Sequence, residues 1–316
     1  MSADTLETRQ LGRTGLKVTP LCVGGALLGS MPETFGYEVP LERALATLRR
    51  AFAGPINFLD TSNNYGGGES ERRIGIVLRE LGGVPDGFVL ATKVDPDEAG
   101  DYSGERVRRS FEESLERLGI SRVPLVYLRA LGKMSFEDGV APDGPLPALI
   151  GLQSEGIIDH LGVSGGSIGL LRRYLDTGAF DVAITHNRYT LVDQSAEPLL
   201  DEAAELGIAV VNGAPFGGGV LAKGPGVDRN YAYKPAADEV LGRIEQMEDA
   251  CRGRGIPLAA AALQFSLREP RIASTIVGGS RPERIDETLR LAQWPIPDEL
   301  WDELRSLAAP REYWLG

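Results

Sequence analysis

The residues best suited to chemistry lie in a short polar stretch that follows an apolar run. Asp60 comes directly after the apolar segment 56–59, Tyr65 follows five residues later, and a glycine-rich turn then leads into a helical pattern near Glu69. Lys93 ends the next apolar run. An ammonium group held by a carboxylate beside a phenol favours the phenolate form. A tyrosine in that setting can donate a proton to a developing alkoxide, or accept one in the reverse direction.

Each of these residues also has an ordinary structural interpretation. Asp60 and Lys93 can form an ion pair that only stabilises the fold, and Tyr65 can be a turn residue with an ordinary phenol. A run such as Gly66–Gly68 is most often a flexible turn. The chemistry therefore depends on whether the fold brings the three side chains together.

Composition narrows the class of protein. The 316 residues are 42% hydrophobic and 25% charged, which is typical of a soluble globular chain. A net charge of -12 argues against nucleic acid or an anionic membrane as a partner. The acidic N-terminus and the lack of a long apolar span predict neither a signal peptide nor a transmembrane helix. Two cysteines make no disulfide framework, so we expect a cytoplasmic protein. The presence of only two histidines and two cysteines argues against a zinc site.

The elements that must position these side chains alternate along the chain. Short apolar segments are expected as strands at 18–23, 56–59, 88–92, 125–128, 157–163, 182–185, 208–211 and 272–277. Helical patterns are expected at 41–53, 69–81, 104–118, 145–155, 170–175, 197–206, 237–254, 257–268, 281–291 and 297–307. A Gly- and Pro-rich loop fills 212–235.

Strands and helices that alternate evenly, without a linker, predict an α/β fold in one domain over residues 1–316. Eight such strands favour a closed (β/α)8 barrel, the TIM barrel. An open doubly wound sheet is the alternative. No G-x-G-x-x-G follows the first strand, which weakens a dinucleotide-binding fold of that kind.

In a (β/α)8 barrel the residues that follow the strands line one rim, and catalysis takes place there. The candidates at this rim are Gly24, Gly25, Asp60, Tyr65, Lys93, Arg129, Ser164, Gly165, Asn187, Arg188, the loop 214–219 with Ala214, Phe216 and Gly218, and Gly278, Gly279 and Ser280.

Taken together, Asp60, Tyr65, the continuation 68–71 (Gly-Glu-Ser-Glu) and Lys93 resemble the aldo-keto reductase superfamily. The resemblance covers nearly the whole chain, and its other parts are 11–18, the strand end Gly24-Gly25, 162–164 and 276–282. The segment 187–191 (Asn-Arg-Tyr-Thr-Leu) is similar to the branch that oxidises free aldoses, the D-threo-aldose 1-dehydrogenase or L-fucose dehydrogenase type.

This resemblance implies a barrel that binds NADP or NAD across its rim without a metal, and a sugar or a small aldehyde or ketone as substrate. Tyr65 would be the acid/base, tuned by Lys93 and Asp60. The carboxamide of the nicotinamide would be held by Ser164 and Asn187, and backbone amides of 214–221 would approach the pyrophosphate. The other implied cofactor-binding residues are Gly24, Gly25, Asp60, Gly165, Ala214, Phe216, Gly218, Gly278, Gly279, Ser280 and Arg284.

Arg284 lies where the family often binds the adenosine 2′-phosphate, which favours NADP slightly. Gly278 stands where the family usually has a lysine, so NAD remains an alternative. Gly213 stands where the family often stacks a tyrosine on the nicotinamide, and Phe216 is either its substitute or a core residue.

The main departure from the family is Arg129, which stands where a catalytic histidine follows the fourth strand, and the next residues, 130–133, differ as well. A guanidinium can polarise a carbonyl oxygen as a fixed cation, but it cannot act as a base at neutral pH. It can also repel Lys93 or draw Asp60 away from it. Neither His160 nor His186 obviously replaces the missing imidazole. The departure therefore predicts impaired turnover with cofactor binding largely preserved.

Two other functions remain open at this point. A catalytically silent barrel that binds NAD(P)H or a sugar is motivated by Arg129. An unrelated barrel, such as a metal-dependent lyase or isomerase, is disfavoured because histidines are scarce. The sequence determines neither the particular substrate nor the oligomeric state.

Overall fold

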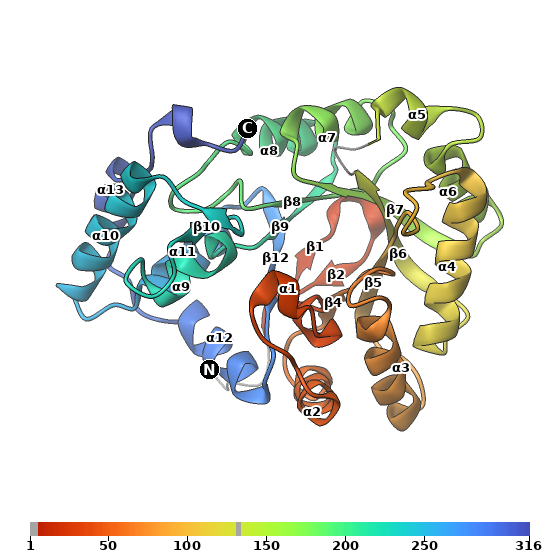
Figure 1. Ribbon diagram of the computed structural model, residues 1–316, viewed down its shortest axis with the longest axis horizontal. Helices are drawn as coiled ribbons and strands as arrows, with labels where there is room; N and C mark the ends of the chain where they lie inside the picture. The colour runs from red at the N-terminus through yellow and green to blue at the C-terminus, as the bar shows by residue number, and fades with distance from the viewer. Residues whose placement is uncertain (1–5, 131–133) are drawn as a thin grey trace.

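Eight parallel strands close into a barrel at the centre of the molecule, as the computed structural model shows for residues 6–130 and 134–316 (Figure 1). Around the barrel the order of the strands is β12-β3-β4-β5-β6-β7-β8-β9. Their bounds are β3 Leu21–Gly24, β4 Phe58–Asp60, β5 Val89–Val94, β6 Val123–Ala130, β7 Ile158–Gly165, β8 Val182–His186, β9 Ala209–Gly213 and β12 Ile272–Gly278. The predicted (β/α)8 barrel is confirmed, and the open sheet is wrong.

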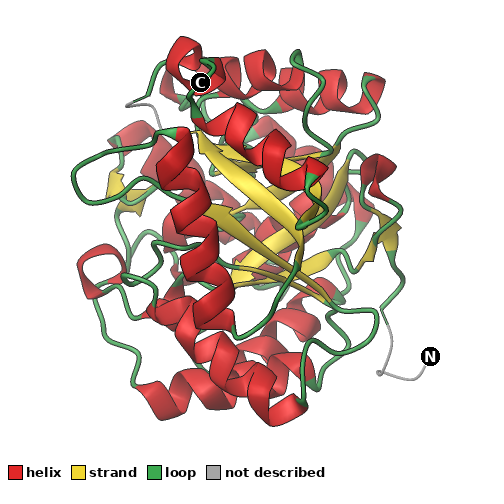
Figure 2. Cartoon of the chain, turned by 90° about the vertical axis from the view of Figure 1, so that its right-hand side faces the viewer, coloured by secondary structure: helices red, strands yellow, loops and turns green. Residues whose placement is uncertain are grey.

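Helices surround the strands on the outside, and Figure 2 shows them on both sides of the barrel. The longer helices are α2 Leu41–Phe52, α3 Glu69–Leu81, α4 Gly104–Leu118, α6 Pro145–Ser154, α7 Ile168–Leu175, α8 Glu197–Glu205, α10 Asp238–Arg252, α11 Leu258–Leu267, α12 Pro282–Ala292 and α13 Asp298–Ser306. Shorter elements are α1 Pro32–Phe35, α5 Phe136–Val140, α9 Val220–Lys223, the hairpin β1 Arg9–Gln10 with β2 Lys17–Val18, and the hairpin β10 Asn230–Tyr231 with β11 Lys234–Pro235.

Local signals explain where these helices begin and end. In α4 the side chain of Ser103 accepts a hydrogen bond from the backbone amide of Arg106, which caps the first turn. At the other end Gly119 adopts the left-handed conformation with φ 69°, as glycine does readily. Both ends of this helix lie where the sequence predicts them.

Alternation along the strands decides which side chains enter the barrel. Ala91, Tyr127 and Ile184 belong to a buried cluster inside the barrel, whereas their strand neighbours pack in the cluster under the helices. Since side chains alternate between the two faces of a strand, Lys93 and Arg129, two residues beyond Ala91 and Tyr127, point into the mouth of the barrel.

Two regions differ from the sequence prediction. The segment 18–23 is not one strand, because β2 ends at Val18 and β3 begins at Leu21. Pro20 lies between them and has no amide hydrogen for a continuous ladder. The loop 212–235 is not irregular throughout, since it contains α9 and the hairpin β10–β11.

Within residues 6–130 and 134–316 no helix is long and apolar enough to cross a membrane. The predicted features at residues 1–5 and 131–133 lie outside the described residues.

Packing inside the barrel predicts that alanine substitutions at two glycines have opposite effects on stability. A Cβ at Gly162 would lie 2.2 Å from Cδ1 of the buried Tyr127, whereas a Cβ at Gly169 in α7 would meet nothing within 4 Å. We expect Gly162→Ala to lower the free energy of unfolding by about 1–3 kcal/mol through overpacking. The matched control Gly169→Ala should raise it by about 0.5 kcal/mol. Urea denaturation measures both, and equal effects of the two variants would contradict the packing described here.

Candidate active site

A buried ion pair joins the ends of two neighbouring strands at the mouth of the barrel. The ammonium of Lys93 donates to the carboxylate of Asp60, and also to the backbone oxygen of Thr61 at 2.7 Å. The two charged side chains are 2% and 4% exposed. Burial lowers the pKa of Lys93, but the charges of Asp60 and Tyr65 more than offset this, so the pKa is raised overall. Lys93 is therefore an ammonium at neutral pH.

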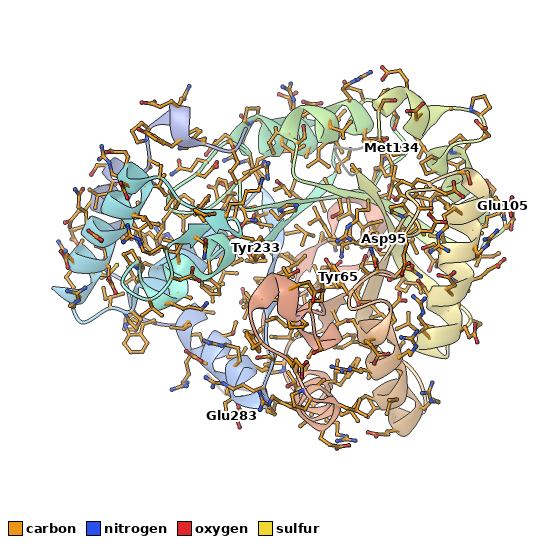
Figure 3. All side chains as sticks on the ribbon, in the orientation of Figure 1. Tyr65, Asp95, Glu105, Met134, Tyr233 and Glu283 are labelled. Atoms are coloured by element: carbon orange, nitrogen blue, oxygen red, sulfur yellow. The ribbon has the colours of Figure 1, made fainter. Side chains whose placement is uncertain are left out.

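The half-buried Tyr65 lies directly beside this pair. Figure 3 labels it near the centre of the view. Its ring centroid is 5.0 Å from Nζ of Lys93 and 5.1 Å from Cζ of Arg129. The phenol thus lies between two cations, which arrive from β5 and β6. The structure brings together the four residues that the sequence predicts as catalytic.

The glycine turn after Tyr65 has a conformational reason. Gly66, Gly67 and Gly68 have φ values of 61°, 61° and 91°, a region that other residues rarely adopt. A Cβ on Gly66 would also lie 2.0 Å from the carbonyl oxygen of Gly29. These glycines are required by the shape of the turn and by its contact with the loop after β3, rather than by a need for flexibility.

Arg129 is held by a carboxylate that the sequence analysis missed. Its Nη1 donates to Oδ1 of Asp95 at 2.9 Å, and the two side chains are 23% and 0% exposed. Burial lowers the pKa of Arg129, but the Asp95 carboxylate more than offsets this and raises it. The expectation that Arg129 draws Asp60 away from Lys93 is wrong, because Asp95 takes the guanidinium instead. The missed signal was a second carboxylate two residues after Lys93.

The two histidines lie in different environments. His160 contacts the carboxylate of Asp181 at 3.3 Å, at the start of β7 and away from the mouth. His186 ends β8, and its Nδ1 is 3.3 Å from the Asn187 side-chain nitrogen. Burial, followed by the charges of Arg188, Arg129 and Lys93, lowers the pKa of His186 to about 4. His186 is therefore a neutral imidazole near the two rim cations.

Two buried oxygen atoms at the rim fit the polar groups of a nicotinamide nucleotide. Within the described residues, Oδ2 of Asp60 and Oδ1 of Asn187 have no hydrogen-bond partner. Asn187 is 2% exposed and has a φ of 60°, and Ser164, at the end of β7, is 5% exposed. An unpartnered buried acceptor is costly, so each oxygen is suited to an N–H or O–H donor from a ligand. A carboxamide and a ribose hydroxyl supply such donors.

The predicted glycines at the first strand end are closely packed. A Cβ on Gly24 would lie 2.9 Å from Cγ2 of Ile276, and one on Gly25 would lie 2.9 Å from Oγ of Ser70. Packing of β3 is therefore sufficient to explain both glycines. Gly165 ends β7 and pairs with Ala130 across the sheet.

The loop after β9 folds back onto the hairpin β10–β11. Ala214 has a φ of 53°, and a Cβ on Gly217 would lie 2.5 Å from the ring of Tyr231. Gly218 has a φ of 84° and approaches the backbone of the hairpin. Phe216 packs against the main hydrophobic core, which favours the interpretation of a core residue.

The last predicted cofactor residues follow β12. Gly278 is exposed and Gly279 is buried, and a Cβ on Gly279 would lie 3.4 Å from Cγ of Arg284. The hydroxyl of Tyr37 donates to Oγ of Ser280 at 3.1 Å. Arg284 is paired with Glu287 at 2.9 Å, with side chains 39% and 34% exposed. The arginine is therefore next to the strand end but partly neutralised.

Within the described part of the chain there is no group of three or more His, Cys, Asp and Glu side chains able to hold a metal ion.

Comparisons with known proteins show the family of the chain. Residues 20–309 match the family model described as the Aldo/keto reductase family. Similar proteins include a pyridoxal 4-dehydrogenase of Microbacterium luteolum, 32% identical over 95% of this chain and 97% of that protein. A D-threo-aldose 1-dehydrogenase of Pseudomonas sp is 30% identical over 92% of this chain and 94% of its own length. An L-galactose dehydrogenase of Arabidopsis thaliana is 33% identical over 96% and 95%.

The fold also matches a solved structure. An aldo-keto reductase from Bacillus halodurans, in its holo form, has a TM-score of 0.77, with 22% identity and 96% of each chain covered.

The environment of His186 predicts a pH dependence of stability. Its pKa is about 4 in the folded protein, against about 6.5 in the unfolded chain. Between about pH 6.5 and pH 4 the unfolded state therefore binds more protons than the folded state. The contribution of neutral His186 to the free energy of unfolding is present above about pH 6.5 and is lost as the pH falls toward about 4. The loss amounts to at most about 3 kcal/mol.

Urea denaturation between about pH 8 and pH 4, in the wild type and in His186→Gln, measures this contribution. The variant should show a weaker fall in stability over that range. His160→Gln is the matched control, since the chain has only two histidines. An NMR titration that placed the His186 transition near the ordinary value would refute the expectation.

Proposed function

Because the chain belongs to the aldo/keto reductase family, whose members are NAD(P)-dependent oxidoreductases, we propose that it transfers a hydride between nicotinamide and a sugar or a small aldehyde or ketone. Tyr65 is the acid/base in this proposal. The observation that carries it is the position of the Tyr65 ring, with the cations of Lys93 and Arg129 about 5 Å from its centroid. The names of the three similar proteins support an aldehyde or a sugar as the substrate, and two of them favour an aldose.

The proton is handled by the protein's own side chains. When bound, the nicotinamide supplies or accepts the hydride. In the direction of reduction, the Tyr65 phenol donates its proton to the substrate oxygen, and in oxidation the phenolate takes the proton back. Negative charge develops on the phenol oxygen during donation, and the buried ammonium of Lys93 stabilises it without reorganising.

Asp60 has two roles in this proposal. One carboxylate oxygen holds the Lys93 ammonium, and the other, which has no partner among the described residues, accepts from a ribose hydroxyl of the cofactor. Asn187 and Ser164 would hold the carboxamide, since Oδ1 of Asn187, which also has no partner among the described residues, suits an amide N–H. Each of these contacts fixes the cofactor relative to Tyr65.

Arg129 replaces the family histidine and limits the chemistry. Its guanidinium can hold the substrate oxygen as a fixed cation, but it cannot take up a proton. We therefore place the turnover below that of an enzyme with the histidine. A second function stays in consideration, because Arg129 is already neutralised by Asp95: a silent barrel that binds NAD(P)H or a sugar without turnover.

The role of Tyr65 is tested with Tyr65→Phe, which removes only the hydroxyl. We expect kcat to fall by about 10²–10⁴-fold, because the proton donor is lost, while the Kd of NAD(P)H changes by less than about threefold. Aldoses and aldehydes are assayed with both cofactors by absorbance of the nicotinamide, and binding is measured by calorimetry. Tyr313→Phe, at an exposed position near the C-terminus, is the matched control.

The two functions give different results in that experiment. Nucleotide binding without turnover in the wild type would favour the silent barrel, and Tyr65→Phe would then change no rate. The absence of both turnover and NAD(P)H binding in the wild type would reject the proposal.

We propose NADP as the preferred cofactor, with NAD as the alternative, on the basis of Arg284. A guanidinium can bind the 2′-phosphate that distinguishes NADP, by exchanging its contact with Glu287. Arg284→Gln should weaken NADPH binding by about tenfold or more and leave NADH binding nearly unchanged. Calorimetry measures both, with the exposed Arg290→Gln on the same helix as control. Equal effects on the two cofactors would contradict this assignment.

A further inference from the structure

Asp95 is a fully buried carboxylate at the mouth of the barrel that the proposed proton transfer does not use. It directly follows β5 and is 0% exposed. Oδ2 accepts from the hydroxyl of Ser62 at 2.5 Å and from the backbone amide of Asn64 at 3.1 Å. Oδ1 accepts from Nη1 of Arg129 at 2.9 Å. One oxygen therefore holds the loop that carries Tyr65, and the other holds the guanidinium beside the Tyr65 ring.

We propose that Asp95 is a positioning residue that fixes the Tyr65 phenol and the Arg129 guanidinium relative to one another. The proposal rests on the proposed function, which makes these two groups the ones that contact the substrate oxygen. Leaving either oxygen of a buried carboxylate without a donor costs free energy, so Asp95 favours the arrangement in which its partners stay close on both sides. Moving the loop or the guanidinium alone would leave one of the two buried oxygens of Asp95 without a donor.

The connection to Tyr65 continues through the backbone. The amide of Tyr65 donates to the carbonyl oxygen of Ser62 at 3.2 Å, so the residue whose hydroxyl Asp95 holds also closes the turn that presents the phenol. Asp95, Ser62 and Tyr65 thus form a short chain of hydrogen bonds. A shift of the Asp95 carboxylate would be transmitted to the phenol within these two steps.

Asp95 is itself held rigidly by α4. Its amide donates to Oγ of Ser110 at 3.1 Å, and its carbonyl oxygen accepts from Nε of Arg106 at 3.3 Å. Arg106 also donates to the side chain of Asn63, and Arg117 donates to the Asn63 carbonyl oxygen at 2.8 Å. The helix therefore holds both the carboxylate and the loop that it contacts. A site built on such supports keeps its geometry before substrate arrives.

Tyr102 adds a contact on the Arg129 side. Its hydroxyl accepts from the backbone amide of Arg129 at 2.9 Å and donates to the carbonyl oxygen of Val94 at 2.8 Å. The Tyr102 hydroxyl therefore links the backbone just before Asp95 with the backbone of Arg129. Both the backbone amide and the guanidinium of Arg129 are held by hydrogen bonds.

Two sets of variants separate the contact of Asp95 with the loop from its contact with Arg129. In Asp95→Asn the backbone amide of Asn64 can only donate, so the side-chain oxygen must stay on the loop side and the NH2 group must face Arg129. This variant therefore releases the guanidinium and keeps the loop. In Arg129→Met the guanidinium is absent, and Asp95→Ala in that background releases the loop without leaving an unpaired arginine.

The first test is a double-mutant cycle on kcat/KM with an aldehyde or aldose that the wild type turns over. Asp95→Asn should lower kcat/KM by about tenfold or more, with the Kd of NAD(P)H unchanged. In the Arg129→Met background the same substitution should change kcat/KM by less than about twofold. Asp86→Asn, an exposed carboxylate before β5, is the matched control. Equal losses in both backgrounds would overturn the proposal, because the effect of Asp95 would then not depend on Arg129.

The second test needs no turnover, so it separates this proposal from the proposed function. Hydrogen exchange of the amides of Asn64 and Tyr65 is measured in Arg129→Met and in the double variant Asp95→Ala/Arg129→Met. Exchange at both amides should be about tenfold faster in the double variant, because the acceptor that orders the loop is gone. Unchanged exchange would overturn the proposal that Asp95 orders the loop carrying Tyr65, even if no substrate is found.

Discussion

The buried contact between the Lys93 ammonium and the Asp60 carboxylate is the constraint on which the mouth of the barrel depends. Taking two charges out of water costs several kcal/mol for each, and only close, well-oriented partners offset this. The register of β4 and β5 supplies that geometry, since Asp60 lies opposite Ala91, two residues before Lys93. The ammonium also donates to the Thr61 carbonyl oxygen, so a second of its N–H groups has an acceptor in the buried site. Tyr65 is then held over a cation that cannot move into solvent.

A second ion pair, between Arg129 and the buried Asp95, forms one strand further on. The two pairs place two cations and two carboxylates within one small region, so the pairs are neutral as a set while the cations still flank Tyr65. An arginine without its own carboxylate would compete for Asp60. Asp95 removes that competition, which is why the guanidinium is accommodated beside an intact Lys93–Asp60 pair.

The surrounding scaffold leaves little freedom to these groups. Close backbone contacts between the loops after β3 and β4, at Gly29 and Gly66, shape the turn after Tyr65. Arginines of α4 hold the residues just before it. Two buried acceptors, on Asp60 and Asn187, are left without partners in the described residues. A rigid mouth with a few unpaired acceptors is suited to a polar ligand that brings its own donors.

The sequence by itself predicted the barrel, and it singled out three residues that the structure brings together at the mouth. The apolar periodicity placed the strands within a few residues. Asp60 and Lys93 followed from their positions at predicted strand ends, and Tyr65 from the polar stretch after Asp60. Only the tertiary structure decided the partner of Arg129, because Asp95 is 34 residues away in the chain and meets it through the register of β5 and β6. The packing contacts that require Gly24, Gly25 and Gly66 could likewise not be read from the sequence, because they come from other strands and loops. Periodicity specifies which face a side chain takes, whereas the partner it meets there depends on pairing between distant strands.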